Sequence, residues 1–321
     1  MMPALVLAAF FFSSVLFQAQ DLTLREEAER IVERADAAST SPNLPNLERV
    51  DTFRAFGDGA PQEGTVTRVV IQGVGRRDEY KLGDYDLINV WTQKQVAVKG
   101  TQGILPPDLD TVARNTPINL VRFDDQDVIR TIGDRQISGH SARCIQFDTI
   151  HGAKTDSNEI CVDTTNGMFL QEKLGQEFIE YGDYFPFAGA LMPGSIRYSF
   201  AGAAKLEITQ MMTALSASDA NVLAAPPNAS MHGICTTFRR PFGVSMPQPK
   251  AGNGGSTTDI VIRGTVGFDG KVYGAVVQSS ERPDLNQEAL TLVNQWRFTP
   301  AMCNGKPDAH EVDFTLEFQG R

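Results

Sequence analysis

The sequence has few histidines and none of the motifs on which catalytic sites are commonly built. Its 321 residues include four histidines, and none stands beside a GxSxG turn, an HExxH helix or a cysteine nucleophile. The glycine-rich stretch 264–274 lacks the Lys-Ser or Lys-Thr pair of a phosphate loop. The acidic loop Asp124–Asp127 lacks the glycine and the distal glutamate of an EF-hand. We therefore expect a protein that is not an enzyme and that binds no cofactor or metal.

Hydrophobic runs of membrane-spanning length are also missing. The apolar run Ala4–Phe17 has fourteen residues, whereas a spanning helix needs about 20. A secretory signal peptide over residues 1–19 fits this length better. No positive charge precedes the run, and Phe17 stands where a small residue is preferred, so an uncleaved anchor is the alternative. In both cases we expect the rest of the chain to be exported.

Basic charge is scarce in most of the chain. The sequence has 29 Lys and Arg against 39 Asp and Glu, a net charge of −10. From Cys235 onward nine basic residues balance nine acidic ones, so the earlier part carries the whole excess (20 − 30 = −10). This acidic part argues against nucleic acid or anionic lipid as its partner. The difference in charge also favours two domains, which the length suggests as well.

Cysteine is rare, but the cysteines are even in number. Cys144, Cys161, Cys235 and Cys303 permit three pairings, which sequence alone does not distinguish. Disulfides are the first expectation in an exported chain. Cys144 and Cys161 flank a predicted hairpin with its midpoint at 152–153, so we pair these two and assign Cys235 to Cys303. Closing the second, longer loop would stabilise the fold by roughly 4 kcal/mol.

A zinc site is the alternative to the second disulfide. His232, Cys235, Cys303 and His310 offer the nitrogen and sulfur ligands of a tetrahedral site. Their spacing is not that of a compact zinc knuckle, and an oxidising compartment converts thiols to disulfides. The sequence therefore favours the disulfide.

The acidic part of the chain begins with a helix and continues mostly as strands. Apolar residues in 22–35 fall on one side of a helix, with charged residues opposite. Over 50–215, runs rich in β-branched and aromatic residues are separated by Gly, Asp and Asn at hairpin distances, which predicts an antiparallel sheet. A short helix with proline in its first turn is expected within 106–115. The small, polar, proline-bearing stretch 214–232 is the predicted linker.

The last part of the chain, from Asp259 to Phe318, predicts strand, turn, strand, helix and strand. Asp269-Gly270 tolerates the positive φ of a tight hairpin and separates two strand-like runs. From Asp284 onward the apolar residues recur at helical spacing. The predicted core of this domain comprises Leu285, Ala289, Val293, Trp296 and Phe298.

The final predicted strand alternates strictly between apolar and polar residues. One face would pack on the helix stripe that ends at Trp296, and the other would face outward. A strand at a sheet edge leaves backbone N–H and C=O groups unpaired, and these groups can accept an added strand. We therefore predict a partner-binding edge strand made of Glu311, Val312, Asp313, Phe314, Thr315, Leu316, Glu317 and Phe318.

Several short motifs of this region occur together and in order. They are Phe268-Asp269-Gly270-Lys271-Val272, Ser279-Ser280, Leu285 with Ala289, Trp296-Arg297-Phe298-x-Pro300-Ala301 and Asn304-Gly305-Lys306-Pro307. This set resembles the TonB C-terminal domain over about residues 235–321. The resemblance implies a periplasmic or secreted envelope protein whose last strand pairs with an extended segment of an outer-membrane receptor. An uncleaved N-terminal segment would tether such a protein to the inner membrane.

Two features depart from the TonB pattern. The usual Tyr-Pro before the first strand is missing, and Phe242-Gly243 and Met246-Pro247 occupy that region. A folded acidic domain stands where a transducer that crosses the periplasm needs a long Pro-rich rod. With its N-terminal helix, antiparallel sheet and helical excursion, this domain resembles the LolA-like half-barrel of periplasmic lipoprotein carriers. The hairpin from Glu159 to Met168 carries most of that resemblance.

The combined expectation is an α+β protein. A signal peptide (1–19) precedes an antiparallel β-rich half-barrel with helices (20–213), the linker (214–232) and a ββαβ TonB-like domain (233–321). The first functional hypothesis is binding of an extended peptide of an envelope partner in connection with TonB-dependent transport. The alternative is a carrier whose strand-rich domain holds a lipid or a lipidated protein, which a long apolar cavity between sheet and helix would favour. No nucleic-acid partner is expected.

Overall fold

The computed structural model describes residues 6–41, 43–57, 60–101, 105–114, 122–151, 154–249, 257–280 and 282–319. The chain is mostly β, and the strand pairs of the described residues are antiparallel. Two compact units are present, Met1–Gln72 with Val112–Asp219, and Gly73–Thr111 with Ala220–Arg321. This division differs from the predicted one, because residues 73–111 group with the C-terminal part of the chain.

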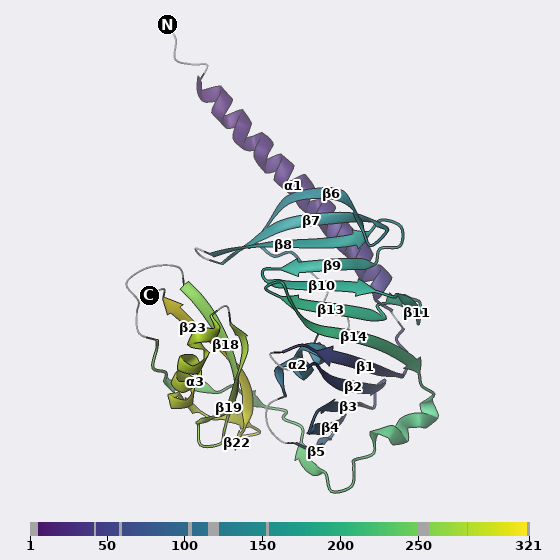
Figure 1. Cartoon of the computed structure of the whole chain (residues 1–321), viewed down its shortest axis with the longest axis vertical. Helices are drawn as coiled ribbons and strands as arrows, with labels where there is room; N and C mark the ends of the chain where they lie inside the picture. Colours follow the sequence, from purple (N-terminus) through teal and green to yellow (C-terminus); the bar gives the residue numbers. More distant parts are fainter. Residues whose placement is uncertain are drawn as a thin grey trace. The chain divides into compact units, whose positions relative to one another are not determined.

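The first unit combines a long helix with an antiparallel sheet (Figure 1). The strands of this unit lie in the order β2, β1, β14, β13, β10, β9, β8, β7, β6. A small hairpin of β11 (Phe185–Phe187) and β12 (Ala190–Met192) accompanies them. The other elements are α1 (Val6–Ser39), β1 (Leu47–Ala55), β2 (Gln62–Ile71), β6 (Asp127–Ile137), β7 (His140–His151), β8 (Lys154–Asp163), β9 (Phe169–Leu174), β10 (Glu177–Gly182), β13 (Ser195–Phe200) and β14 (Ala203–Ala214).

The core of the first unit lies between α1 and strands β6 to β9. Ala28, Val32 and Ala35 recur at helical spacing and are at most 4% exposed. They pack against fully buried strand residues such as Ile160 and Phe169. The sequence predicts this apolar stripe within 22–35, and the helix that carries it is longer than the stripe.

The structure describes only part of the predicted signal peptide. Residues 1–5 of the predicted signal peptide lie outside the described residues, and α1 is helical without interruption from Val6 to Ser39. Among the described residues, no helix combines the length and apolar character needed to cross a membrane. The signal peptide therefore stays a prediction.

The second unit contains a group of strands from the middle of the chain. β15 (Ser230–Gly233), β5 (Gln95–Gly100), β4 (Tyr85–Thr92) and β3 (Gly75–Leu82) lie in that order. The short helix α2 (Pro107–Arg114) starts in this unit, with proline at its first position. The predicted linker 214–232 is partly regular structure, because it contains the 3₁₀ helix η1 (Ala217–Leu223) and most of β15.

The C-terminal part of this unit is a three-stranded sheet with one helix. Its strands lie in the order β19, β18, β23. Short strand pairs, β16 with β21, β21 with β22 and β17 with β20, surround it. The bounds are β16 (Phe238–Arg239), β17 (Phe242–Ser245), β18 (Thr257–Val266), β19 (Val272–Ser280), η2 (Pro283–Leu285), α3 (Asn286–Gln295), β20 (Arg297–Thr299), β21 (Ala301–Cys303), β22 (Lys306–Asp308) and β23 (His310–Gln319).

Both expected disulfides are confirmed. Cys144 in β7 lies directly opposite Cys161 in β8, with 4.1 Å between their Cα atoms. Cys235 is bonded to Cys303 in β21, with a Cα–Cα distance of 5.2 Å. The second bond consumes both thiols of the alternative zinc site, and no group of three metal-binding side chains occurs in the part of the chain that the structure describes.

Candidate functional site

Strand β23 forms one edge of the C-terminal sheet. It pairs with the central strand β18 from Thr257 opposite Gln319 to Val266 opposite His310. This ladder has ten residue pairs and no shift of register. The other edge is β19, whose pairing with β18 shifts at two places, between Val261 and Ile262 and between Arg263 and Thr265. The two edges of the sheet therefore differ in regularity.

The side chains of β23 alternate between a buried and an exposed face. Phe314, Leu316 and Phe318 are at most 5% exposed and belong to the core under α3. Val312 is partly buried beside them, whereas the polar residues Glu311, Asp313, Thr315 and Glu317 are exposed. The pleat thus leaves one face of the strand for packing and the other for solvent or a partner.

Trp296 directly follows α3 and lies in the core of this sheet. It is 4% exposed, and its ring meets that of Phe314 edge to face with 5.4 Å between centroids. Its indole N–H donates to the Pro247 carbonyl oxygen at 2.9 Å. The other predicted core residues lie in the same cluster: Ala289 and Val293 are fully buried, and Leu285 and Phe298 are partly buried.

The polar face of the sheet is built around a buried arginine. Arg263 in β18 is 4% exposed at its side chain and donates to both carboxylate oxygens of Asp313, at 2.6 and 2.8 Å. It also forms an ion pair with Asp110 in α2. The hydrogen bonds that Arg263 donates to Asp313 and Asp110 raise its pKa further above the ordinary value, although burial opposes this effect. Asp313 is thus both exposed on the outward face of β23 and part of this ion-pair cluster.

The segment before α2 contacts the start of β23. The Leu105 backbone N–H donates to the Glu311 carboxylate. Together with the Asp110–Arg263 ion pair, this bond fastens residues 105–110 to the polar face of the C-terminal sheet within the second unit. No sequence signal points to these contacts, because their partners are about 150 to 200 residues apart in the chain.

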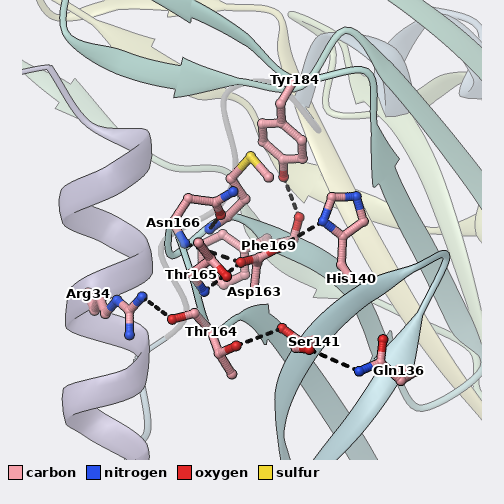
Figure 2. Close-up of polar contacts among 11 residues, drawn as sticks. Arg34, Gln136, His140, Ser141, Asp163, Thr164, Thr165, Asn166, Phe169 and Tyr184 are labelled. Carbon is pink, nitrogen blue, oxygen red and sulfur yellow. Dashed lines mark hydrogen bonds and ion pairs between the residues drawn. The ribbon is translucent and has the colours of Figure 1, made fainter.

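In the first unit, a polar network surrounds the turn between β8 and β9 (Figure 2). Asp163 accepts hydrogen bonds from the backbone N–H groups of Thr165 and Asn166 and from His140 Nδ1 at 2.8 Å. Burial alone would raise the pKa of Asp163, but these bonds outweigh burial and lower it. Arg34 of α1 donates to the Thr164 carbonyl oxygen. The network therefore fixes the turn and attaches it to the helix.

A cavity of about 710 Å³ opens beside this turn. Its lining mixes His140, Tyr184 and Arg197 with the acidic Glu180 and with apolar residues such as Leu170. A His–Asp pair can activate a neighbouring hydroxyl or thiol. Among the described contacts of His140, however, the hydrogen bond leads to Asp163, and all four cysteines are in disulfides. The His140–Asp163 hydrogen bond belongs to the network that fixes the turn.

The space between helix and sheet bears on the carrier hypothesis. A cavity of about 380 Å³ beside α1 is lined by Glu29, Val32, Glu33, Asp36, Arg122 and Phe123. Four of these six side chains are charged, which does not suit an acyl chain. The nearby interface of α1 with the strands is filled by the packed apolar core. The carboxylates of the acidic loop Asp124–Asp127 form hydrogen bonds within the loop. The Asp124 carboxylate accepts a hydrogen bond from the Gln126 backbone N–H, and the Asp127 carboxylate accepts one from the Asp124 backbone N–H.

Comparison with known families identifies the C-terminal domain. Residues 249–319 match the family model of the Gram-negative bacterial TonB protein C-terminal. This part of the chain is similar to the TonB C-terminal domain. The match contains β18, β19, α3 and β23, which are the elements of the candidate site. Among curated proteins, none matches the sequence.

Solved structures resemble the chain over its larger part. A LolA superfamily protein from Nitrosomonas europaea is 13% identical, with a TM-score of 0.38, over 60% of this chain and 96% of its own. A DUF1329 family protein from Desulfovibrio piger is 10% identical, with a TM-score of 0.40, over 62% and 97%. The MucA/MucB complex of Pseudomonas aeruginosa contains a chain that is 13% identical, with a TM-score of 0.27, over 77% and 83%. These scores are low, and the likeness carries no argument about function.

Proposed function

We propose that this protein is an envelope adaptor whose TonB C-terminal domain binds an extended peptide of an outer-membrane or periplasmic partner by strand addition at β23. The match of residues 249–319 supports a TonB-family envelope protein. The observation that carries the binding mode is the ten-residue ladder of β23, which has no register shift and lies at the edge of the sheet. Such an edge offers a regular row of backbone groups to a further strand.

The opposite edge is less suited to the same role. The pairing of β19 with β18 has two register shifts, and Gly274 within β19 has a φ of 60°. Bulges and positive-φ residues twist a strand and interrupt the row of backbone groups that an added strand needs. Of these two edges, β23 is therefore the one that accepts a partner strand.

The hairpin between β18 and β19 indicates which backbone groups of β23 point outward. The Gly267 N–H donates to the Lys271 carbonyl oxygen, so Gly267 directs its backbone groups toward β19. Because these directions alternate along a strand, Val266 and every second residue before it direct theirs toward β23. Their partners in β23 include Val312, Phe314 and Leu316. The intervening residues, including Thr315 and Glu317, thus direct N–H and C=O groups to the free edge.

The outward side chains define the chemistry of the partner. Glu311, Asp313 and Glu317 place carboxylates on the exposed face of β23, and Arg263 already pairs with Asp313. A partner strand with basic or neutral side chains on this face avoids repulsion from these carboxylates. Affinity would come mainly from backbone hydrogen bonds, with side chains adding selectivity.

A proline substitution at Thr315 tests the proposal. Proline removes one outward N–H and is tolerated on the free side of an edge strand, so Thr315→Pro should fold. Thr315→Ala is the matched control, because it removes the same exposed side chain and keeps the N–H. The immobilised protein is first used to capture its partner from envelope extract. A synthetic peptide that copies the captured segment is then titrated against each variant.

We expect Thr315→Ala to bind the peptide like the parent and Thr315→Pro to bind at least about tenfold more weakly, since a hydrogen bond and the local strand geometry are both lost. Circular dichroism verifies that both variants are folded. Equal affinity of a folded Thr315→Pro variant and its alanine control would rule out strand addition at this edge.

A further inference from the structure

The C-terminal domain exposes large apolar side chains on a face that its core does not use. Phe242 is 74% exposed, Val244 66%, Phe268 65% and Tyr273 51%. These residues come from the edge strand β17, from the turn between β18 and β19 and from the start of β19. So much exposed apolar surface within one small region is characteristic of an interaction site.

Strand pairing places parts of this surface side by side. Phe242 in β17 lies opposite Thr299 in β20, and Ser245 lies opposite Arg297. On its other side Arg297 forms a bridge with Lys271, directly after the turn that contains Phe268. Residues opposite each other in antiparallel strands share a face. The side chain of Phe298 belongs to the core, so its chain neighbours Arg297 and Thr299 face outward. The residues opposite these two, Lys271 and Phe242 among them, face outward with them.

Basic residues surround the apolar side chains. Arg239 ends β16, Arg240 follows it, and Pro241 separates them from β17. Both arginines are exposed, and neither has an ion pair with a carboxylate among the described contacts. Arg297 donates to the backbone oxygens of Asn294 and Trp296. Lys271 pairs with Asp269 at 3.4 Å. This local positive charge contrasts with the acidic excess of the chain before Cys235.

We propose that this surface, which we call the apolar–basic face, docks on an anionic lipid bilayer. It comprises Arg239, Arg240, Phe242, Val244, Phe268, Lys271, Tyr273 and Arg297. Aromatic and aliphatic side chains that protrude from a turn and an edge strand enter the boundary between head groups and acyl chains, while nearby Arg and Lys side chains attract anionic head groups. The charge complementarity favours a bilayer with negative lipids over a neutral one. This inference does not depend on strand addition at β23.

Position-specific fluorescence quenching tests the proposal on the full chain. Val244→Trp places a reporter on the apolar–basic face. Met211→Trp places one at a residue of β14 that is 62% exposed but lies outside the face, and it serves as the matched control. Vesicles contain brominated phosphatidylcholine, with or without phosphatidylglycerol, and the unsubstituted chain gives the baseline from Trp91 and Trp296. Because the readout is local, an N-terminal segment that brings the chain to the vesicle does not mask the result.

We expect the emission added by Val244→Trp to be quenched several times more strongly than that added by Met211→Trp, and only when phosphatidylglycerol is present. Replacing Arg239 and Arg240 by glutamine in the Val244→Trp chain should weaken vesicle binding through this face by roughly fivefold for each charge removed. Equal quenching at the two positions overturns the proposal. Quenching at residue 244 that is indifferent to phosphatidylglycerol and to both arginines overturns it as well. An unquenched Val244→Trp chain, combined with loss of the captured envelope partner in Phe242→Ser, assigns the face to a protein instead.

Discussion

Replacing Trp296 by alanine should unfold the C-terminal domain far more readily than any change on its surface. The indole is 4% exposed and packs on Phe314 and Phe298, with centroid distances of 5.4 and 6.3 Å. Truncation of a buried tryptophan costs about 3–5 kcal/mol through lost burial and the cavity left behind. A domain of this size has only about 5–15 kcal/mol of stability in total, so this loss is a large fraction of it.

Trp296→Phe is the matched comparison for the alanine variant. It keeps an aromatic ring next to Phe314 but removes the N–H that donates to the Pro247 oxygen at 2.9 Å. Pro247 is exposed, so water can replace the lost donor, and the hydrogen-bond part of the loss should be only about 1 kcal/mol. The two variants together separate the contribution of the ring from that of the hydrogen bond.

Hydrogen exchange of the backbone amides of α3 and β23 measures the loss of stability within the C-terminal domain itself. Unfolding of the first unit does not obscure this measurement. Since every 1.4 kcal/mol is a factor of ten, Trp296→Ala should accelerate exchange of the slowest amides in both elements by at least about a hundredfold. Trp296→Phe should accelerate it much less. An acceleration below about tenfold for the alanine variant would refute the reasoning, because it would mean that the ring adds little to the core.

Three further outcomes follow from the contacts described above. Burial raises the pKa of Glu172 from 4.5 to about 7, so the unfolded state releases this proton at lower pH than the folded state. The stability that this group contributes is therefore full below about pH 4.5, and up to roughly 3 kcal/mol of it is lost as the pH rises through about 7. The free energy of unfolding of Glu172→Gln, measured by denaturation, should lack this pH dependence. Removing the Cys235–Cys303 bond with two serines should lower the denaturation midpoint of the C-terminal domain, by an amount equivalent to roughly 4 kcal/mol for the 68-residue separation. Asp313→Ala leaves the buried Arg263 with one carboxylate fewer and should cost about 1–3 kcal/mol, whereas the exposed Glu317→Ala should change the midpoint little; equal midpoints for these two variants would contradict the role of the ion-pair cluster.

The sequence predicts what depends on local pattern. Strict alternation in residues 311–318 indicates a strand with one apolar face, and Asp269-Gly270 indicates the hairpin whose Gly270 has a φ of 74°. The pairing of Cys144 with Cys161 follows from a hairpin that brings them opposite each other. In each case the residues that interact are close in sequence or repeat at the period of one element.

The sequence does not predict contacts between distant segments. The ion pair of Arg263 with Asp110 joins two residues that carry no shared motif. Glu172 in β9 carries an ionisable side chain, which is usually exposed, and is nevertheless 2% exposed beside Tyr181. Residues 230–233 look like linker in composition, yet they form β15 beside β5. Such contacts depend on how whole elements pack, which composition and periodicity do not specify.

The most direct test of strand addition is the exchange of individual backbone amides in β23 with and without the captured partner peptide. If the peptide pairs with this edge, the outward amides of Thr315 and Glu317 should exchange rapidly in the free protein and become protected in the complex. The amides of Phe314 and Leu316, which face β18, should be protected in both states. Protection that appears on β19 instead, or unchanged exchange of the two outward amides at saturating peptide, would contradict the account.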